Sequence, residues 1–352
     1  MHVDLPMPPV LYGDSCQAKS SGTELSLGMR EKEDYMKAVV LNSVTPAEQV
    51  TLSEVKIPEV RPGWVLVKVK AFGMNHSEKV LRLQEIENEY IQKPITPGIE
   101  CVGEIVHPSD SHFEKGQKVV ALMGGMGRSF HGSYAEYVLL PAHHVFGVDT
   151  SLSWKELAAV PETYFTAWGS LFECLKLVKE DVLLIRGATC ALGYAAMQLA
   201  KEVGCKVVVT THKECKLPLL KGADEAVLDT GKLQGQLSGV TKVLELVGPK
   251  TLYDTLRCME KGGIVCQTGI LGGVYALNGF DPIKFIPNGV YLTGFYSNAP
   301  TQEVMDKIFS FICENNLRPC VGAEFDFSEI KEACMALDSG NVNGKIVVKM
   351  ME

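Results

Sequence analysis

The chain has 352 residues, of which 46% are hydrophobic, and this is enough apolar material for two cores of ordinary size. Its 34 Lys and Arg against 42 Asp and Glu give a net charge of -8, and no basic block is present, which argues against nucleic acid as a partner. There is no secretory signal and no apolar run of roughly 18 residues, and the 11 cysteines form no CxxC pair. We therefore expect two domains, no membrane span and a reducing, cytoplasmic environment.

Residues 1–35 differ in composition from the rest of the chain. They mix Pro, Gly, Ser and charged residues without hydrophobic periodicity, and they contain too many acidic residues for a transit peptide. We interpret them as a flexible N-terminal extension that precedes the first domain.

Two sequence patterns follow one another along the remaining chain. In residues 36–160, short β-rich runs such as WVLVKVKAFG (64–73) are separated by turn residues, which is typical of a small, mostly β domain. In residues 161–298, apolar strands alternate with helices, which predicts an α/β domain with a parallel sheet covered by helices. Residues 304–315 indicate a helix, and residues 344–350 indicate a strand that we expect to rejoin the first domain.

The sequence GATCALG, from Gly187 to Gly193, follows the apolar strand VLLIR and precedes an amphipathic helix over residues 192–203. A dinucleotide-binding loop at such a place usually has three glycines, for the tight turn, the close approach of the pyrophosphate and the packing of helix on strand. Here Cys190 and Ala191 occupy the middle of the loop. The N–H groups at the helix start can still hold a diphosphate if these two side chains point away. The alternative is an ordinary strand-to-helix turn.

The next strand, KVVVT (206–210), comes where a Rossmann site contacts the adenine ribose. A site for NAD normally has an Asp or Glu at the end of this strand, whereas this sequence continues as TTHKECK (210–216). Small hydroxyl groups together with Lys213 and Lys216 suit a 2′-phosphate, so the sequence predicts NADPH as the cofactor. A solvated helix start explains Lys213 equally well and Lys216 less well.

Several stretches together resemble a known family over nearly the whole of residues 36–350. They are RPGWVLVKVKAFGMNHSE, TPGIECVGEIV, GSYAEYVLLP, AAVPETYFTAW, ALGYAAMQLAKEVGCKVVVTT, CMEKGGIVCQTG and NGKIVVKM. Through these stretches the chain is similar to the zinc-free quinone oxidoreductase branch of the medium-chain dehydrogenase/reductase superfamily. This resemblance implies an α/β protein with a GroES-like β-rich domain (36–160 and 299–352), a Rossmann domain with a doubly wound parallel sheet (161–298), and a reduced nicotinamide in the cleft between them.

The resemblance also bears on zinc. Relatives that use zinc have a Cys, a His and a Cys where this chain, by alignment, has Asn75, Ile99 and Glu162. A single carboxylate cannot replace three good ligands. The cysteine-rich loop that holds structural zinc in those relatives is absent as well, since MGGMGRSFHGSY (123–134) has no Cys. The expectation is a protein without a metal site.

The resemblance assigns residues to the site. It makes Asn75, Thr166 and Tyr90 the candidate catalytic residues, the first two beside the nicotinamide and the third as a hydrogen-bond donor or acid for an enone. The loop around Tyr90 is longer and more charged than in the family, so a packing tyrosine is the alternative. The implied cofactor-binding residues are Cys190, Ala191, Leu192 and Gly193 for the pyrophosphate, Thr210 and Lys216 for the adenosine phosphate, Thr166, Gly269 and Ile270 for the nicotinamide, and Asn343 in the partly matching stretch NVNGK.

The implied activity is transfer of hydride from NADPH to a quinone or to the activated C=C bond of an enone, both of which need little electrophilic help. One alternative is reduction of an enoyl thioester, for which Lys79, Arg82 and Arg128 would form a basic rim. Another is a low-turnover nucleotide-sensing or scaffold protein derived from the family, because two loop glycines are missing and Glu245 replaces the usual Asp. We expect a homodimer, because GVYLTGFY (289–296) resembles the edge strand through which the family often pairs.

Overall fold

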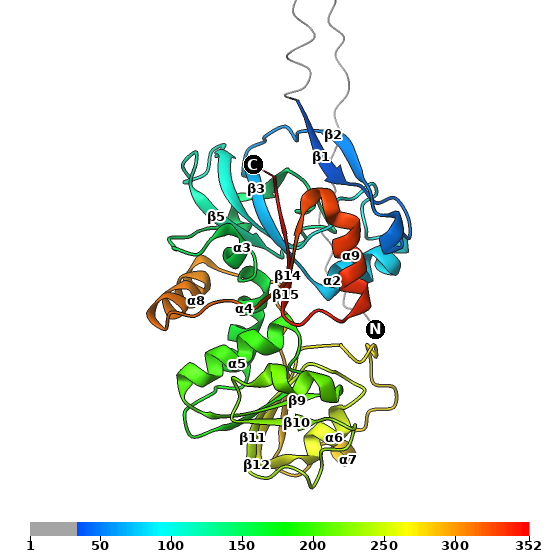
Figure 1. Cartoon of the computed structure of the whole chain (residues 1–352), viewed down its shortest axis with the longest axis vertical. Coiled ribbons are helices and arrows are strands. Elements are labelled where there is room, and N and C mark those ends of the chain that lie inside the picture. Colours follow the sequence, from blue (N-terminus) through cyan, green and yellow to red (C-terminus); the bar gives the residue numbers. More distant parts are fainter. Residues whose placement is uncertain (1–33, 352) are drawn as a thin grey trace, which may run out of the picture. The chain divides into compact units, whose positions relative to one another are not determined.

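The computed structural model describes residues 34–351, so nearly all of the expected N-terminal extension, residues 1–35, lies outside the described residues. The described chain contains a mixed sheet of seven strands, a parallel sheet of six strands and a small sheet that pairs β1 (Tyr35–Val39) with β2 (Leu52–Lys56). Figure 1 shows the order of these elements along the chain. The α/β fold with a GroES-like β-rich part and a Rossmann part is thereby confirmed.

The mixed sheet has the order β14-β15-β3-β4-β5-β7, and β6 pairs with β3 beside this path. All of its strands are antiparallel except the pair β14 and β15. The last strand, β15, pairs with β3 and so returns the chain to the first sheet, as its sequence predicts. The strands are β3 (Trp64–Met74), β4 (Glu100–His107), β5 (Lys118–Leu122), β6 (Tyr137–Pro141), β7 (Val145–Gly147), β14 (Val321–Asp326) and β15 (Lys345–Lys349).

The parallel sheet has the order β10-β9-β8-β11-β12-β13. The chain starts at β8 in the middle, winds outwards through β9 and β10, and then returns to wind in the other direction from β11. A crevice at the carboxyl ends of β8 and β11, where the winding reverses, is the place where doubly wound sheets bind ligands. The strands are β8 (Val182–Arg186), β9 (Lys206–Thr211), β10 (Glu225–Leu228), β11 (Val240–Glu245), β12 (Met259–Gln267) and β13 (Tyr291–Gly294).

Helices cover both faces of the parallel sheet, which explains why its strands are apolar throughout. Helix α5 (Ala191–Val203) packs on one face, and α6 (Leu252–Arg257) packs on the other; Figure 1 shows them on opposite sides of β9 to β12. Six residues of α5 recur at helical spacing and form its apolar face. Four of them are buried, namely Ala195, Ala196, Leu199 and Ala200, and the two at the ends, Leu192 and Val203, are half-buried.

The remaining helices lie mostly around the mixed sheet and between the two sheets. They are α2 (His76–Leu83), α3 (Trp154–Leu157), α4 (Pro161–Trp168), α7 (Pro282–Phe285), α8 (Gln302–Glu314) and α9 (Ile330–Ser339), with a π-helical turn at Gly169–Cys174 and 3-10 turns at Ala47–Gln49, Glu85–Glu87, Ala142–His144, Glu214–Leu220 and Phe327–Glu329.

One apolar core cluster joins both sheets. It contains Val102 and Leu122 of the mixed sheet, Ile185 and Val209 of the parallel sheet, and the buried side of α4 between them. The strands of the mixed sheet come from residues 64–147 and 321–349 and those of the parallel sheet from residues 182–294. On this basis we propose the domain division 36–160 with 299–352, and 161–298.

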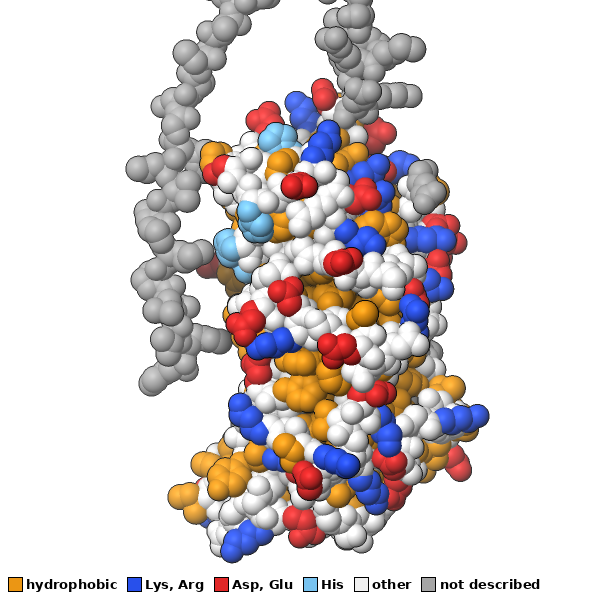
Figure 2. Space-filling model, turned by 90° about the vertical axis from the view of Figure 1, so that its left-hand side faces the viewer, with side chains coloured by type: hydrophobic (Ala, Val, Ile, Leu, Met, Phe, Trp, Pro, Cys, Tyr) orange, Lys and Arg blue, Asp and Glu red, His pale blue; other side chains and the backbone are white. Residues whose placement is uncertain are grey.

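Charged side chains are interspersed over the surface. Figure 2 shows Lys and Arg side chains mixed with Asp and Glu on one face of the molecule. Within residues 34–351, every helix falls short of the length and apolar character that a membrane span requires.

Gly193 generates a prediction about stability. A Cβ at this position would lie far inside contact distance of the backbone oxygen of Ala188, so α5 would have to move away from β8. We expect Gly193→Ala to lower the free energy of unfolding by about 1 to 3 kcal/mol, the usual cost of overpacking. Urea unfolding followed by circular dichroism measures this. The matched control is Gly222→Ala, because the nearest atom to its Cβ is the flexible end of Met197 at 3.1 Å; equal stability losses in both variants would contradict the packing role.

Candidate functional site

The loop between β8 and α5 lies at the point where the winding of the parallel sheet reverses. Gly187 has a φ of +89°, which an L side chain rarely adopts, so this glycine makes the tight turn. Cys190 is the N-cap of α5, and its thiol accepts a hydrogen bond from the N–H of Gly193 at 3.4 Å. Ala191 and Leu192 begin the helix. The loop therefore has the turn and the helix start that a diphosphate needs, although the sulfur already contacts one N–H group.

Thr210 and Lys216 occupy different environments. Thr210 is fully buried at the end of β9, and its hydroxyl accepts a hydrogen bond from the N–H of Gly187 at 3.1 Å. This hydroxyl ties β9 to the loop, so a direct contact with an adenosine phosphate, as the resemblance implied, does not fit its position. Lys216 is only 8% exposed. Burial lowers the pKa of Lys216, and the nearby charge of Lys213 lowers it further. The charge of Lys216 in turn partly offsets the effect of burial, which raises the pKa of the Cys190 thiol.

The segment before β15 reaches the same loop. Gly344 forms an isolated bridge with Cys190, and the ammonium of Lys213 donates a hydrogen bond to Asn341 Oδ1 at 3.1 Å. The side-chain oxygen of Asn343 is buried and accepts no hydrogen bond from any residue in the described range 34–351. Asn343 therefore lies beside the loop between β8 and α5, which we call the phosphate loop, and has an unused acceptor; its contact with a cofactor stays a prediction.

The carboxyl end of β11 forms the other side of the crevice. Glu245 accepts hydrogen bonds from the N–H groups of Val247 (2.8 Å) and Gly248 (3.0 Å), and its backbone oxygen accepts one from Gly269 (3.0 Å). Burial raises the pKa of Glu245. A Cβ at Gly269 would overlap the backbone of Leu246, so the two loops approach each other too closely for any other residue. Gly269 and the following Ile270 are thus held next to the end of β11.

A buried Arg lies beneath these loops and was not anticipated from the sequence. Arg186, the last residue of β8, is fully buried and forms ion pairs with Asp229 (2.7 Å) and Asp254 (2.9 Å). It also donates a hydrogen bond to Thr255 Oγ1 at 2.8 Å, and Thr255 in turn contacts the Glu245 carboxylate. Paired in this way, the charge connects the carboxyl ends of β8 and β11 with Asp229 after β10 and with α6, and removal of one partner would leave a buried charge uncompensated.

A second polar cluster surrounds Asn75, which is the N-cap of α2. The ammonium of Lys345 contacts three groups: Glu100 Oε1 at 2.5 Å, Asn75 Oδ1 at 2.6 Å and Thr163 Oγ1 at 2.9 Å. Asn75 Nδ2 donates to Glu100 Oε1 at 2.8 Å. Glu78 accepts the backbone N–H groups of Asn75 (2.6 Å) and Ile99 (3.2 Å). We call this set, together with Glu162, Thr166 and Ser297 described next, the polar network.

Glu162 joins α4 to the polar network. Its backbone N–H donates to Glu100 Oε2 at 2.8 Å, and its carboxyl Oε1 accepts hydrogen bonds from Thr166 Oγ1 (2.8 Å) and Ser297 Oγ (2.6 Å). Burial raises the pKa of Glu162 to about 8 and that of Glu78 to about 7. The resemblance named Asn75 and Thr166, and the structure connects both through Glu100 and Glu162.

Other predicted residues lie outside these two groups. Tyr90 is 62% exposed, and its hydroxyl accepts a hydrogen bond from Asn88 at 3.4 Å, so it is neither joined to the polar network nor a packing tyrosine. The proposed basic rim is occupied as well. Arg82 forms a bidentate ion pair with Asp338 (2.6 and 2.7 Å), and the ion pair of Arg128 with Glu85 measures 2.7 Å. Lys79 donates to the backbone oxygen of Asp338 at 2.9 Å.

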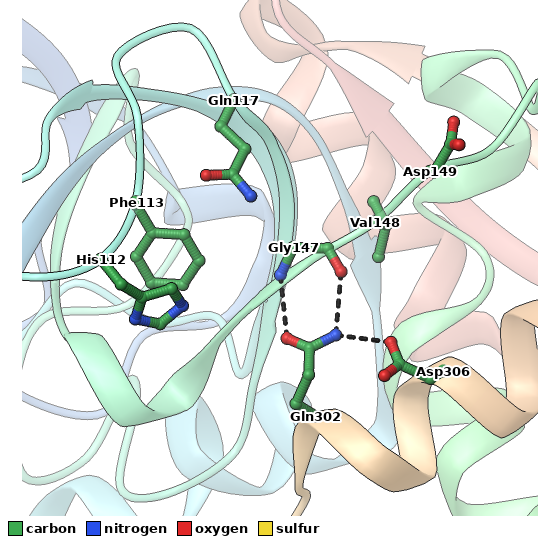
Figure 3. Close-up of a pocket in the computed structure, with 8 residues that line it drawn as sticks. All are labelled: His112, Phe113, Gln117, Gly147, Val148, Asp149, Gln302 and Asp306. Atoms are coloured by element: carbon green, nitrogen blue, oxygen red, sulfur yellow. Dashed lines mark hydrogen bonds between the residues drawn. The ribbon is translucent and has the colours of Figure 1, made fainter.

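A pocket of about 480 Å³ lies elsewhere, between β7 and α8. Figure 3 shows that the Gln302 side chain bonds to the N–H (3.1 Å) and C=O (3.0 Å) of Gly147 and to Asp306 (2.7 Å). None of the predicted site residues lines this pocket. Its hydrogen bonds through Gln302 attach α8 to the mixed sheet, so we interpret it as a structural contact between these two elements. Within residues 34–351, no three or more His, Cys, Asp or Glu side chains are placed to share a metal ion.

Comparisons with known proteins agree with this geometry. The family model of the alcohol dehydrogenase GroES-like domain matches residues 61–150, and that of the zinc-binding dehydrogenase matches residues 221–348. The chain is 27% identical over 337 residues to the quinone oxidoreductase of Homo sapiens, and the aligned region covers 91% of this chain and 99% of the human protein. It is 25% identical over 350 residues to a zinc-type alcohol dehydrogenase-like protein of Schizosaccharomyces pombe, with 90% and 99% covered.

The structure of the quinone oxidoreductase from Coxiella burnetii has the same fold, with a TM-score of 0.78 and 24% identity over 90% of this chain and 100% of that one. The chain therefore belongs to the medium-chain dehydrogenase/reductase superfamily, and the relatives with which it aligns include quinone oxidoreductases. It is an oxidoreductase of this superfamily, so the resemblance seen in the sequence is confirmed for the superfamily, while independence from zinc stays a prediction.

The raised pKa of Glu162 predicts how stability depends on pH. A carboxyl group with an ordinary pKa of 4.5 that rises to about 8 on folding binds its proton more tightly in the native state, so its contribution is full below 4.5 and is lost as the pH rises to about 8. We expect the free energy of unfolding to fall over this range, by at most about 1.4 kcal/mol per pH unit for this group.

Urea unfolding of the native protein and of Glu162→Gln at several pH values tests this. The variant should show a flatter dependence, while Glu303→Gln, which alters an exposed side chain, should keep the native slope. Identical slopes in the native protein and in Glu162→Gln would mean that Glu162 is ionised in the folded state.

Proposed function

We propose that the protein is an NADPH-dependent reductase that transfers hydride to a quinone or to the activated C=C bond of an enone, without zinc. The observation that carries the choice of cofactor is Lys216, which is 8% exposed and close to Cys190, together with the missing acid at the end of β9, where a site for NAD normally has one. Gly187, Gly193, Gly269 and the start of α5 fit a dinucleotide, which supplies the hydride when bound. Asn343, with its unused oxygen, adds a further polar contact on the same side.

The polar network supports the choice of reaction. Asn75, Thr166 and Ser297 carry hydrogen-bonding groups that can orient a carbonyl substrate and stabilise the charge that develops on its oxygen. The positions that align with zinc ligands in relatives hold Asn75, Ile99 and Glu162, and Glu162 is already hydrogen-bonded to Thr166 and Ser297. Acceptors that are conjugated need no strong Lewis acid, and the name of the human relative, quinone oxidoreductase, points in the same direction.

Two alternatives have less support. An enoyl thioester reductase needs free basic groups at its rim, whereas Arg82 and Arg128 are engaged in ion pairs. A low-turnover sensor or scaffold is favoured by the Cys190 thiol, which already accepts one N–H group of the loop. Glu245 does not favour it, because its carboxylate holds the loop after β11 in place.

We also propose that the protein is a cytoplasmic homodimer whose partner is a second copy of this chain. β13 is an edge strand of the parallel sheet, and Tyr291 and Tyr296 beside it are 61% and 80% exposed. An edge strand with large exposed side chains is suited to pairing with another copy.

The activity is tested by mixing the purified full-length chain with NADPH and a panel of quinones and enones. We expect oxidation of NADPH and, from an enone, the saturated ketone. An allylic alcohol as main product would contradict reduction at the C=C bond. Absence of any turnover, with NADPH bound, would favour the sensor or scaffold.

Lys216→Glu tests the choice of NADPH. A charge-assisted contact contributes roughly 1.5 to 3 kcal/mol, which corresponds to about 10- to 150-fold in affinity. We expect the Michaelis constant for NADPH to rise by that factor and the constant for NADH to change little. Lys179→Glu, an exposed lysine before β8 at the opposite end of the sheet, serves as control. Equal effects of Lys216→Glu on both cofactors would show that Lys216 does not recognise the 2′-phosphate.

A further inference from the structure

The carboxyl group of Glu162 has one oxygen without a partner. Oε1 accepts hydrogen bonds from Thr166 and Ser297, but Oε2 is buried and accepts none from the described residues 34–351. An ionised carboxylate would leave charge on an oxygen that neither water nor a donor reaches, which is costly. A neutral carboxylic acid lowers this cost, because burying an unpartnered neutral oxygen is less unfavourable than burying an unpartnered charge.

The charges around Glu162 point the same way. Burial of Glu162 is the largest cause of its raised pKa of about 8, and the negative charge of Glu100 on β4 raises this pKa further. Lys345 on β15 acts in the opposite direction, but its ammonium is already bound to Glu100, Asn75 and Thr163. Glu162 therefore holds a proton at neutral pH without a counter-charge of its own.

The hydroxyl group of Ser297 can connect the carboxyl group of Glu162 with the exterior of the polar network. Oε2 is enclosed and Thr166 is buried, whereas Ser297, in the segment after β13, is only half-buried and lies 2.6 Å from Oε1. We propose that Glu162 stores the proton that the reduction consumes and that the Ser297 hydroxyl passes it to the substrate. This inference rests on the proposed function, and nothing in the chain's family resemblance assigned a role to Ser297.

The step balances as follows for an enone. Hydride from the reduced nicotinamide forms a C–H bond at the β-carbon, and the electron pair of the C=C bond moves towards the α-carbon and the carbonyl oxygen. Before the transfer, the Ser297 hydroxyl turns from Glu162 Oε1 to the substrate, and the acid proton of Glu162, carried on Oε1, takes its place in the 2.6 Å contact. The O–H bond of Ser297 then breaks as its proton bonds to the α-carbon, while the O–H bond of Glu162 breaks and that proton bonds to Ser297 Oγ. The products are the oxidised nicotinamide, the saturated ketone and a Glu162 carboxylate, which regains its proton from water.

The neutral acid can be observed without cofactor or substrate. We expect the infrared difference spectrum between the full-length native protein and Glu162→Gln at pH 6.5 to show the C=O band of a protonated carboxyl group, which is lost as the pH rises through about 8. Glu303→Gln should give no such difference band. Absence of the band for Glu162→Gln would overturn the proton store.

Turnover of an enone tests the relay itself. We expect Glu162→Gln and Ser297→Ala to lower kcat by about 100-fold or more, with NADPH affinity by calorimetry unchanged, and Ser297→Thr, which keeps the hydroxyl, to retain most of the activity. Native kcat should fall as the pH rises through about 8, and Glu162→Gln should lose this dependence. An active native protein with equally active Gln and Ala variants would overturn the relay alone, whereas a native protein inactive towards all quinones and enones would overturn the proposed function together with it.

Discussion

The buried ammonium of Lys345 is the interaction on which the site depends. It comes from β15, near the end of the chain, and contacts Glu100 on β4, Asn75 at the start of α2 and Thr163 on α4. A charge out of water is stable only while its partners keep their positions, and loss of one partner costs several kcal/mol. The four elements are therefore held in one arrangement, and Glu100 extends it by binding the N–H group of Glu162.

The two halves of the site obey different constraints. In the loop between β8 and α5, backbone geometry sets the structure: Gly187 makes the turn, Gly193 allows α5 to approach β8, and the hydroxyl of Thr210 fixes the loop on β9. Around Asn75, buried side chains set the structure, and Glu162 links Thr166 to Glu100. The core that runs through both sheets connects the two ends, so a shift of α4 would affect packing and polar contacts together.

The sequence predicted the fold and the tight turn between β8 and α5 because both depend on local patterns. Apolar runs, their alternation with helices and the glycines of GATCALG are visible within short windows. Buried polar contacts between distant residues are not visible within such windows. Lys345 and Asn75, for example, are 270 positions apart, and no local pattern around either residue indicates that they meet. The bond between the Thr210 hydroxyl and the N–H of Gly187 was not foreseen for the same reason, since the resemblance does not tell whether a hydroxyl faces a ligand or ties a strand to a loop. The exposure of Tyr90 depends on how its own loop folds.

Whether a phosphate loop with Cys190 and Ala191 in place of glycines binds its cofactor is most directly measured by calorimetric titration of the full-length protein with NADPH and with NADH. The loop leads into the N-terminus of α5, and Lys216 and Asn343 lie beside it. We therefore expect saturable binding of one NADPH per chain, and weaker binding of NADH because it has no 2′-phosphate for Lys216. Absence of heat with either nucleotide, or equal affinity for both, would contradict the site described above.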